Sequence, residues 1–304
     1  MKQIIIIILA LSSLSTLAQQ DPHYTQYMYN MNIINPAYAG SNETLSLGML
    51  YRKQWVEIED APTVGTFSIH GPLGKGVGSG ISALTDQIGP VEEQNIYGDF
   101  SYTLKLKGEH RVAFGIKTGA TVHNVGLFSD IYDTLPDEND PAFSENFSKT
   151  YFNMGTGIFY YTNNYYLALS APNILKSKHL NYNGRDFGSE VSHVFLTGGY
   201  VFSLSDNLKF KPFFMTKYAY AAPISLDIST NFFFYDKFEI GATYRIDDSF
   251  GALVNYTISK NLRIGYAYDH IVSDLNVTTP ASHEIFLLFD LNLAKKVSSS
   301  PRYF

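Results

Sequence analysis

Several common features are missing from this sequence of 304 residues, and each absence removes a class of protein. There is no cysteine, which excludes disulfides, thiolate zinc sites and a cysteine nucleophile. Charged residues make up only 16% of the chain, against an average of about 25%. The net charge is −6, so the chain lacks the basic surface of nucleic-acid-binding proteins, and we expect no nucleic acid among its partners.

Long apolar runs are also missing after the first residues. Lys2 is followed by a short apolar run and then by Ala18 at a suitable cleavage point, which is the pattern of a secretory signal peptide. The run is shorter than the roughly 20 residues that a helix needs to cross a bilayer. We interpret residues 1–18 as a cleaved signal peptide, with an uncleaved anchor as the alternative. The mature protein is then either soluble outside the cytoplasm or a membrane β-barrel.

Aromatic residues and glycine are abundant, and apolar and polar side chains alternate along many segments. The chain holds 23 Tyr, 22 Phe and 23 Gly. Within one such segment, Phe238 and Ile240 alternate with Glu239 and Gly241. A period of two is typical of β-strands that have one apolar face.

Fourteen segments have this strand character, and most of them are longer than the 5–6 residues usual in globular proteins. They are long enough for tilted membrane strands, which need about 9–11 residues. An even number suits a single-chain bacterial barrel with both ends in the periplasm. The segments are residues 44–55, 61–71, 76–87, 93–106, 110–124, 151–162, 164–173, 190–204, 207–218, 222–235, 237–246, 249–259, 261–271 and 282–293.

The connections between these segments alternate in length. Tight turns such as "TNN", "YDK" and "SKN" carry turn-forming residues, whereas the other connections are mostly longer, at 56–60, 88–92, 125–150, 174–189 and 272–281. This asymmetry is typical of outer-membrane barrels. We therefore predict an all-β fold, a transmembrane outer-membrane β-barrel of about 14 antiparallel strands with short periplasmic turns and longer extracellular loops. A soluble β-sandwich is the alternative.

Two aromatic clusters flank short turns, at residues 159–166 and 232–238. Aromatic rings favour the boundary between lipid and water, so we predict an interface belt there. Charged residues fall on the polar strand faces and should point into the lumen, where they either tune a pore or pair with one another; we favour pairing. These residues are Lys117, Asp227, Glu239, Arg245, Arg263, Asp269 and Asp290.

No motif for catalysis or for a cofactor is found. The glycine cluster at residues 71–80 does not match a phosphate-binding loop and does not open a helix, so it is interpreted as a turn with small residues on a crowded wall. His283 and Glu284 lack the second histidine of a zinc protease motif. We expect no enzyme activity, no catalytic residue, no metal and no cofactor. The acidic loop at residues 130–143 is either solvated, a calcium site or a docking surface.

The ordered blocks of the sequence resemble those of a known family. The blocks are "QDPHYTQYMYNMNIINPAYAGS" at residues 20–41, "RKQW" at 52–55, residues 60–73 and 76–90, "ASHEIFLLFDLNL", and "SPRYF" at the end. They are similar to the PorP/SprF family of Bacteroidota outer-membrane proteins. The resemblance implies a fourteen-stranded barrel of the type IX secretion system. It also implies a partner, a secreted client with a type B C-terminal domain, such as a gliding adhesin.

These observations divide the chain into four parts. Residues 1–18 form the signal peptide, residues 19–43 a periplasmic or intraluminal segment, residues 44–293 the barrel, and residues 294–304 a periplasmic tail. Disordered segments are poor in aromatic residues, so we predict that the tyrosine-rich residues 20–40 are ordered and pack against the barrel rim. The tail is predicted either to enter the lumen or to bind a periplasmic component.

The resulting functional prediction is a barrel that binds and anchors its client through the outer loops and rim, because long loops on a rigid scaffold commonly carry binding. Other type IX components and outer-membrane lipid are the further expected partners. The alternative is a passive pore for small solutes. The candidate client-binding residues are Asp130, Tyr132, Asp133, Asp137, Asp140, Phe143, Asn173, Tyr182, Arg185 and Asp274.

Overall fold

The computed structural model describes residues 24–126, 147–175, 178–182, 185–189, 192–219, 222–272 and 281–291. The predicted signal peptide, the acidic loop at residues 130–143 and the predicted C-terminal tail lie outside these residues. None of the helices among the described residues is long and apolar enough to cross a bilayer.

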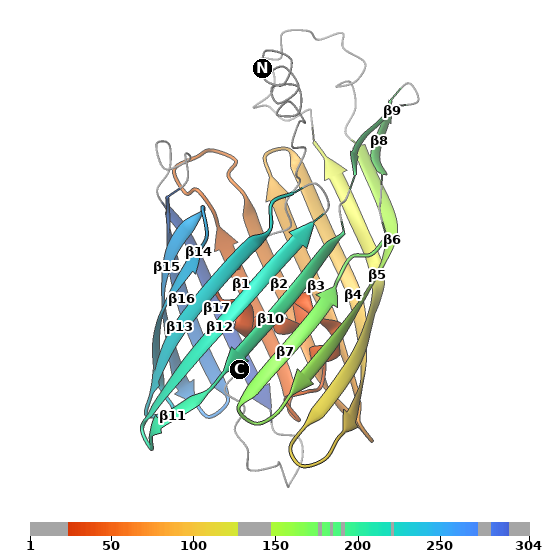
Figure 1. Ribbon diagram of the computed structural model, residues 1–304. Helices are drawn as coiled ribbons and strands as arrows, with labels where there is room; N and C mark the ends of the chain where they lie inside the picture. Colours follow the sequence, from red (N-terminus) through yellow and green to blue (C-terminus); the bar gives the residue numbers. More distant parts are fainter. Residues whose placement is uncertain are drawn as a thin grey trace, which may run out of the picture.

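Antiparallel strands form a closed barrel (Figure 1). The first strand pairs with the last, and β10 pairs with both β7 and β12, which closes the wall. β10 and β11 are two parts of one wall strand, interrupted at Val201, so the wall has 14 strands. The wall strands are β1 (Leu45–Lys53), β2 (Thr63–Gly74), β3 (Val77–Ile88), β4 (Val91–Lys105), β5 (Arg111–Val125), β6 (Phe147–Tyr161), β7 (Tyr165–Ala171), β10 (His193–Tyr200), β11 (Phe202–Ser205), β12 (Leu208–Ala219), β13 (Ser225–Phe234), β14 (Phe238–Arg245), β15 (Ser249–Ser259), β16 (Leu262–Ile271) and β17 (Ala281–Leu291).

The predicted barrel is confirmed, with two local differences. The connection expected at residues 174–189 contains a two-stranded hairpin, β8 (Lys178–Tyr182) and β9 (Arg185–Ser189), which pairs only with itself. The long connection expected at residues 88–92 is wrong, because β3 and β4 extend until only residues 89 and 90 separate them. Gly89 has a φ of 56°, which permits this tight turn.

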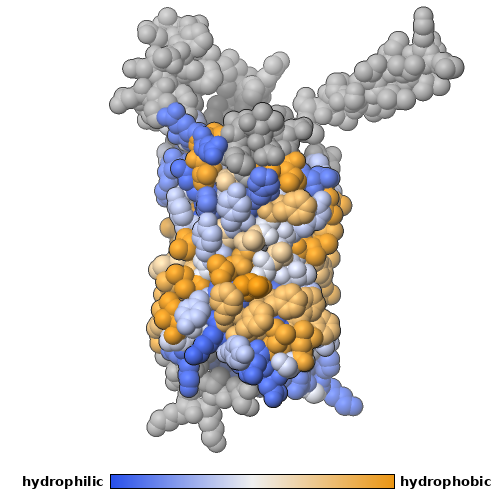
Figure 2. Space-filling view, turned by 90° about the vertical axis from the view of Figure 1, so that its left-hand side faces the viewer, coloured by the Kyte–Doolittle hydropathy of each residue, from blue (hydrophilic) through white to orange (hydrophobic). Residues whose placement is uncertain are grey.

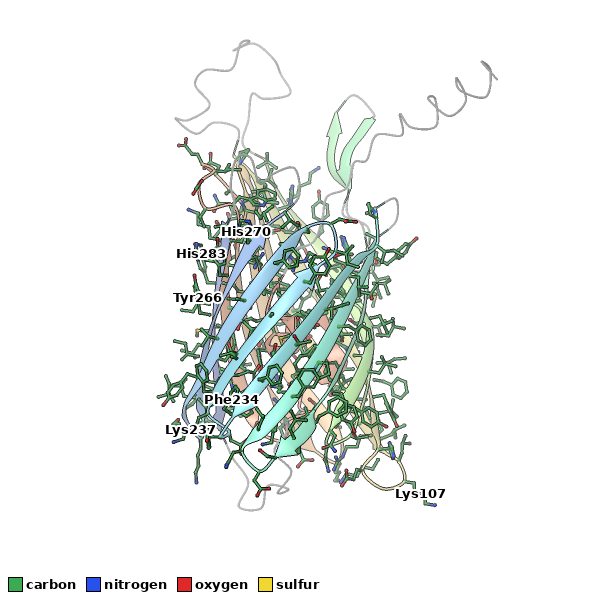
Figure 3. The ribbon with its side chains drawn as sticks, turned by 60° about the vertical axis from the view of Figure 1, so that its left-hand side comes forward. Lys107, Phe234, Lys237, Tyr266, His270 and His283 are labelled. Carbon is green, nitrogen blue, oxygen red and sulfur yellow. The ribbon has the colours of Figure 1, made fainter. Side chains whose placement is uncertain are left out.

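The connections separate the two ends of the barrel. The turns after β2, β4, β6, β11, β13 and β15 are all short, which marks the periplasmic end. Lys107 and Lys237 lie on two of these turns at the lower end of Figure 3, whereas His270 and His283 lie near the opposite, extracellular end. We call these the inner and outer ends.

On the face of the wall seen in Figure 2, apolar side chains gather between polar side chains at the two ends. Outward side chains such as Ile96 and Phe152 are 61% and 63% exposed, as lipid-facing residues are. The predicted aromatic belt is confirmed for the rings of the two clusters that face outward. Ring contacts run around the inner end of the wall through Tyr160, Tyr165, Tyr200, Phe202, Phe210 and Phe232. The alternate residues Phe159, Tyr161 and Phe233 instead point inward and are buried.

Residues 24–41, here called the luminal segment, lie inside the barrel, where Figure 1 shows them in orange-red. The segment contains η1 (Tyr27–Tyr29), α2 (Met31–Ile34) and η2 (Pro36–Tyr38), and every residue except Gly40 is buried. These short helical turns pack against inward-facing wall residues, and together they form the core of the protein.

Candidate functional site

The luminal segment ends in a compact turn built by the sequence "NPAYAG". The Asn35 side chain accepts a hydrogen bond from the Ala37 amide at 2.9 Å and so caps η2, while Pro36 occupies the first helical position. Gly40 has a φ of 72° and directs the chain toward β1. Local backbone requirements therefore explain Asn35, Pro36 and Gly40 of this block.

Glycines on the wall let this turn approach the strands closely. A Cβ at Gly78 would lie 2.1 Å from the Ala39 carbonyl oxygen, and a Cβ at Gly115 would lie 2.2 Å from the Ala37 nitrogen. Neither distance is possible for a real side chain. The interpretation of residues 71–80 as a turn with small residues on a crowded wall is confirmed: Gly74 and Gly76 have positive φ at the turn, and the luminal segment crowds the wall at Gly78.

A buried charged group holds the beginning of the luminal segment near the outer end. Arg52 Nη2 lies 2.7 Å from Asp269 Oδ2, and Arg52 Nη1 lies 3.3 Å from Glu284 Oε2. The backbone amides of Thr25 and Gln26 each donate to a Glu284 oxygen at 2.8 Å. The Thr25 hydroxyl accepts from Arg52 at 2.8 Å and donates to Asp269 at 2.5 Å. We call Arg52, Asp269 and Glu284 the outer clasp.

A second charged pair, the inner clasp, holds Tyr29 nearer the periplasmic end. Lys211 Nζ lies 2.9 Å from Glu239 Oε2 and donates to the Tyr29 hydroxyl at 2.8 Å. The Tyr29 hydroxyl in turn donates to Glu239. Asn231 donates to the same carboxylate at 2.6 Å. Every charge and hydroxyl in this group therefore has a partner, which is what buried charges need.

Lys117 and Asp99 hold the middle of the segment. Lys117 Nζ donates to the carbonyls of Asn32 at 3.3 Å and Ile33 at 2.7 Å, and it lies 3.6 Å from Asp99 Oδ1. The Asn32 side chain donates to Asp99 at 3.1 Å. Wall charges therefore contact the segment near its beginning and through its helical turns.

The predicted pairing of the luminal charges is confirmed for Lys117, Asp227, Glu239, Arg245 and Asp269. Arg245 and Asp227 form their own ion pair of 2.9 Å on neighbouring strands. Sequence reasoning missed four partners, namely Arg52, Asp99, Lys211 and Glu284. Each of them lies at an inward position of a strand with strict alternation, and that position is the signal that identifies them.

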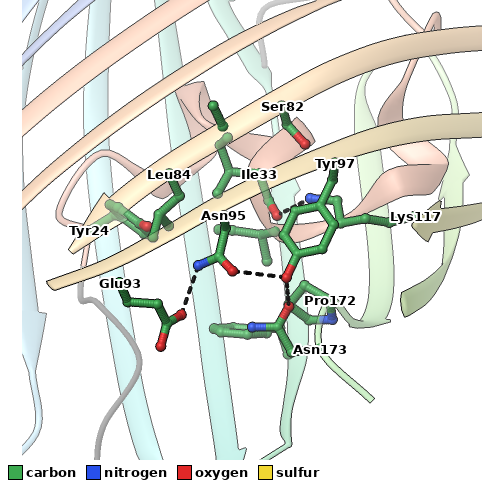
Figure 4. Close-up of a pocket in the computed structure, with 13 residues that line it drawn as sticks. Tyr24, Ile33, Ser82, Leu84, Glu93, Asn95, Tyr97, Lys117, Pro172 and Asn173 are labelled. Atoms are coloured by element: carbon green, nitrogen blue, oxygen red, sulfur yellow. Dashed lines mark hydrogen bonds between the residues drawn. The ribbon is translucent and has the colours of Figure 1, made fainter. Parts of the chain in front are cut away.

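Two hollows lie within the lumen, on opposite sides of the luminal segment. The outer one is bounded by residues of the segment, including Tyr24 and Ile33, and by Asn95, Tyr97 and Asn173 (Figure 4). The inner one touches the segment from Met28 to Asn32 and reaches His70 and Asp290. In this structure the segment stands between the two hollows.

The structure places few of the predicted client-binding residues. Seven of them lie outside the described residues: Asp130, Tyr132, Asp133, Asp137, Asp140, Phe143 and Asp274. The acidic loop, for which a calcium site was one alternative, also lies outside the described residues. Tyr182 and Arg185 face each other across the β8–β9 hairpin at the backbone level. Asn173 follows β7 and accepts a hydrogen bond from the Tyr97 hydroxyl at 3.1 Å, on the wall of the outer hollow. No cluster of metal-ligating side chains occurs in the part of the chain that the structure describes.

Comparison with protein families identifies the chain. A model described as type IX secretion system membrane protein PorP/SprF matches residues 16–289. The chain belongs to this family. The match spans the luminal segment, both clasps and nearly all of the wall, so the family of this protein is the one that the sequence blocks resemble. No curated protein matches the chain.

Solved structures share the fold of this PorP/SprF protein at low identity. The CymD monoaromatic hydrocarbon channel has a TM-score of 0.52 at 11% identity, over 86% of this chain and 92% of that one. The toluene transporter TodX of P. putida has a TM-score of 0.50 at 10% identity, over 88% and 95%. Omp33 of Acinetobacter baumannii has a TM-score of 0.48 at 11% identity, over 82% and 100%. Family and fold together make this an integral outer-membrane protein.

Proposed function

We propose that this barrel binds a secreted client of the type IX system at the cell surface and anchors it through the client's type B C-terminal domain. Membership of the PorP/SprF family supports a role beside secretion components. The observation that carries the proposal is the filled lumen. A barrel whose interior is occupied by its own ion-paired segment is suited to act as a rigid platform, with no chemical step of its own.

The client-binding surface proposed here is the outer end. The connections between β5 and β6, between β7 and β10, and between β16 and β17 all leave the wall at that end, and long loops on a scaffold commonly carry binding. The ten candidate residues named from the sequence lie in or beside these connections and remain part of the proposal. A client approaching from the cell surface would meet them first.

The passive pore is the weaker alternative. An open aqueous channel needs a continuous polar path, whereas the luminal segment carries fully buried residues such as Tyr27 and Ala37 across the lumen. The likeness to channel proteins is a likeness of fold and says nothing about transport. Planar-bilayer measurements address this alternative, since a plugged barrel should give no steady conductance.

Affinity purification tests the proposal. The protein is tagged after Phe304, extracted in mild detergent, and its partners are identified by mass spectrometry. We expect a large secreted polypeptide whose recovery depends on its C-terminal domain. The matched variant replaces residues 127–146 with a Gly/Ser linker of equal length, and it should recover less client while the barrel still folds. A bare barrel from cells that secrete normally would contradict the anchor function.

A further inference from the structure

β6 has an exposed edge near the outer end of the barrel. It pairs with β5 over its whole length, from Phe147 to Tyr161. On its other side it pairs with β7 only from Thr156 onward, because β7 ends at Ala171. The Ile174 amide adds one further hydrogen bond, to the Met154 carbonyl at 2.8 Å. Within the described ranges, no strand pairs with β6 on that side between Phe147 and Gly155.

The direction of the backbone groups on this edge follows from that last hydrogen bond. The Met154 carbonyl points to the side of β7, and backbone groups alternate in direction along a strand. The amides and carbonyls of Phe152, Thr150 and Ser148 therefore point to the same side, away from β5. Such a row of backbone donors and acceptors is a template for pairing with another strand.

The outward side chains place this edge at the cell-surface end of the apolar band. Ser148 and Thr150 are polar and exposed, whereas Phe152, Met154 and Ile158 are apolar and 63%, 42% and 41% exposed. The side chains therefore change from polar to apolar between Thr150 and Phe152. The edge thus begins in water and ends at the lipid boundary, where a partner from outside the cell can reach it.

A hollow in the outer wall lies directly below the edge. It is bounded by apolar side chains of neighbouring strands, including Phe114, Ile116 and Leu169, and by Thr156 and Ala171, where the β6–β7 pairing begins. A strand added to β6 would continue the line of β7. Its side chains would alternate between the outside and the lumen, as those of β7 do, so the edge suits an amphipathic strand.

Among the described residues, the neighbouring strands of the chain do not pair with this edge. The β8–β9 hairpin follows β7 in sequence, yet its strands pair only with each other. The open stretch matches the usual strand length of about 5–6 residues. Backbone pairing also tolerates differences in partner sequence, while alternate side chains give specificity.

We infer that residues 148–152 of β6 receive an extended, amphipathic strand of the client's C-terminal domain, which joins the barrel sheet through backbone hydrogen bonds. This inference rests on the proposed function and adds the mode of recognition. This recognition site lies on the edge of the wall and not in the lumen, which the luminal segment occupies.

The variant Thr150→Pro tests the inference, with Thr150→Ala as its matched control. Proline removes the amide that faces the gap and leaves the β5–β6 hydrogen bonds in place, and proline is tolerated on edge strands at such positions. We expect co-purified client to fall by about tenfold or more with Thr150→Pro, the loss expected for one or two backbone hydrogen bonds. Thr150→Ala should retain the client. Heat-modifiable migration in gels verifies that each barrel is folded.

Equal recovery of client by the two folded variants would overturn the inference. Failure of the wild-type protein to recover any client is a different result, which contradicts the proposed function itself.

Crosslinking provides a test that does not depend on proline. Because the chain has no cysteine, Ser148→Cys gives a single thiol to pair with cysteines scanned along the client domain.

Disulfides should form at alternate positions of one client strand, because its side chains alternate between two faces. A bound client that forms no disulfide at any position would contradict strand addition.

Hydrogen exchange of residues 147–153 tests whether another part of the barrel's own chain covers the edge. Backbone amides that face the gap should exchange fast without client and slowly with it. Slow exchange without client would mean that the chain itself covers the edge, which overturns the inference.

Discussion

The two sides of the lumen hold the same segment by different physical means. On the side of β1, β12, β14, β16 and β17, buried charges of the outer and inner clasps form hydrogen bonds with its amides and hydroxyls. On the side of β2 to β6, glycines let the "NPAYAG" turn rest on the wall backbone, although Lys117 and Asp99 also contribute there. The charged side sets the orientation of the segment, and the glycine side sets how closely it packs.

Removing the outer clasp should have the largest effect. Arg52→Ala leaves Asp269 and Glu284 buried without their cation, and breaking a buried pair in this way costs about 3–5 kcal/mol. We expect the free energy of unfolding to fall by that amount in denaturant titrations of the detergent-solubilised or refolded barrel. A loss below about 1 kcal/mol would show that the clasp does not organise the segment.

Filling the glycine side should have an intermediate effect. Gly115→Val places side-chain atoms where the Ala37 nitrogen now lies, and overpacking of this kind costs about 1–3 kcal/mol. The "NPAYAG" turn should leave the wall, so chymotrypsin should cleave at Tyr38 faster than in the wild type. Gly98→Ala is the control, because its nearest neighbour, the Thr118 oxygen, is 3.9 Å away. Equal cleavage of both variants would contradict the role of the close approach.

Removing one hydroxyl from the inner clasp should have an effect no larger than that of the glycine variant. Tyr29→Phe keeps the ring, which stacks on Phe286 at 4.9 Å between centroids, and deletes only the contacts to Lys211 and Glu239. The lost hydrogen bonds should reduce the free energy of unfolding by about 1–3 kcal/mol, because the partners are charged and buried. Unchanged denaturation midpoints would mean that Asn231 and Lys211 satisfy Glu239 without the tyrosine.

A partly exposed ion pair should have the smallest effect and serves as the reference for the other variants. Arg111 and Glu43 lie 3.7 Å apart, and their side chains are 19% and 36% exposed. Such pairs contribute about 0–1 kcal/mol. Arg111→Ala should therefore shift the unfolding curve only slightly, and raising the salt concentration should reduce even that shift. A loss of free energy of unfolding as large as that of Arg52→Ala would mean that a partly exposed pair contributes as much as a buried one.

Much of the wall could be predicted from the sequence because the two faces of each strand meet different environments, so apolar and polar side chains alternate. Along β14 and β16, lipid requires apolar residues outside, and the lumen requires small or polar residues inside, so both faces leave a readable pattern. The inward charges could be placed from the same pattern. Their pairing was favoured from chemistry alone, because an isolated buried charge is costly.

The luminal segment could not be placed in the same way. It is buried on all sides, so its residues show neither a period of two nor one of 3.6, and its helices are too short for a period to emerge. Its contacts with Asp269 and Glu284 span most of the chain length, which no local pattern reports. The β8–β9 hairpin was missed for a related reason, since it pairs only with itself and has no wall face to mark in the sequence.

The position of the outer clasp has a consequence for assembly. Arg52 lies on the first strand and Glu284 on the last, directly opposite each other in the pairing of β1 with β17, while Asp269 lies on the neighbouring β16. The seam that closes the barrel therefore also completes the charged site that grips Thr25 and Gln26. Ring closure therefore also assembles the site that binds the segment, and a barrel that closes with its interior empty leaves the Glu284 carboxylate without the two amides that donate to it.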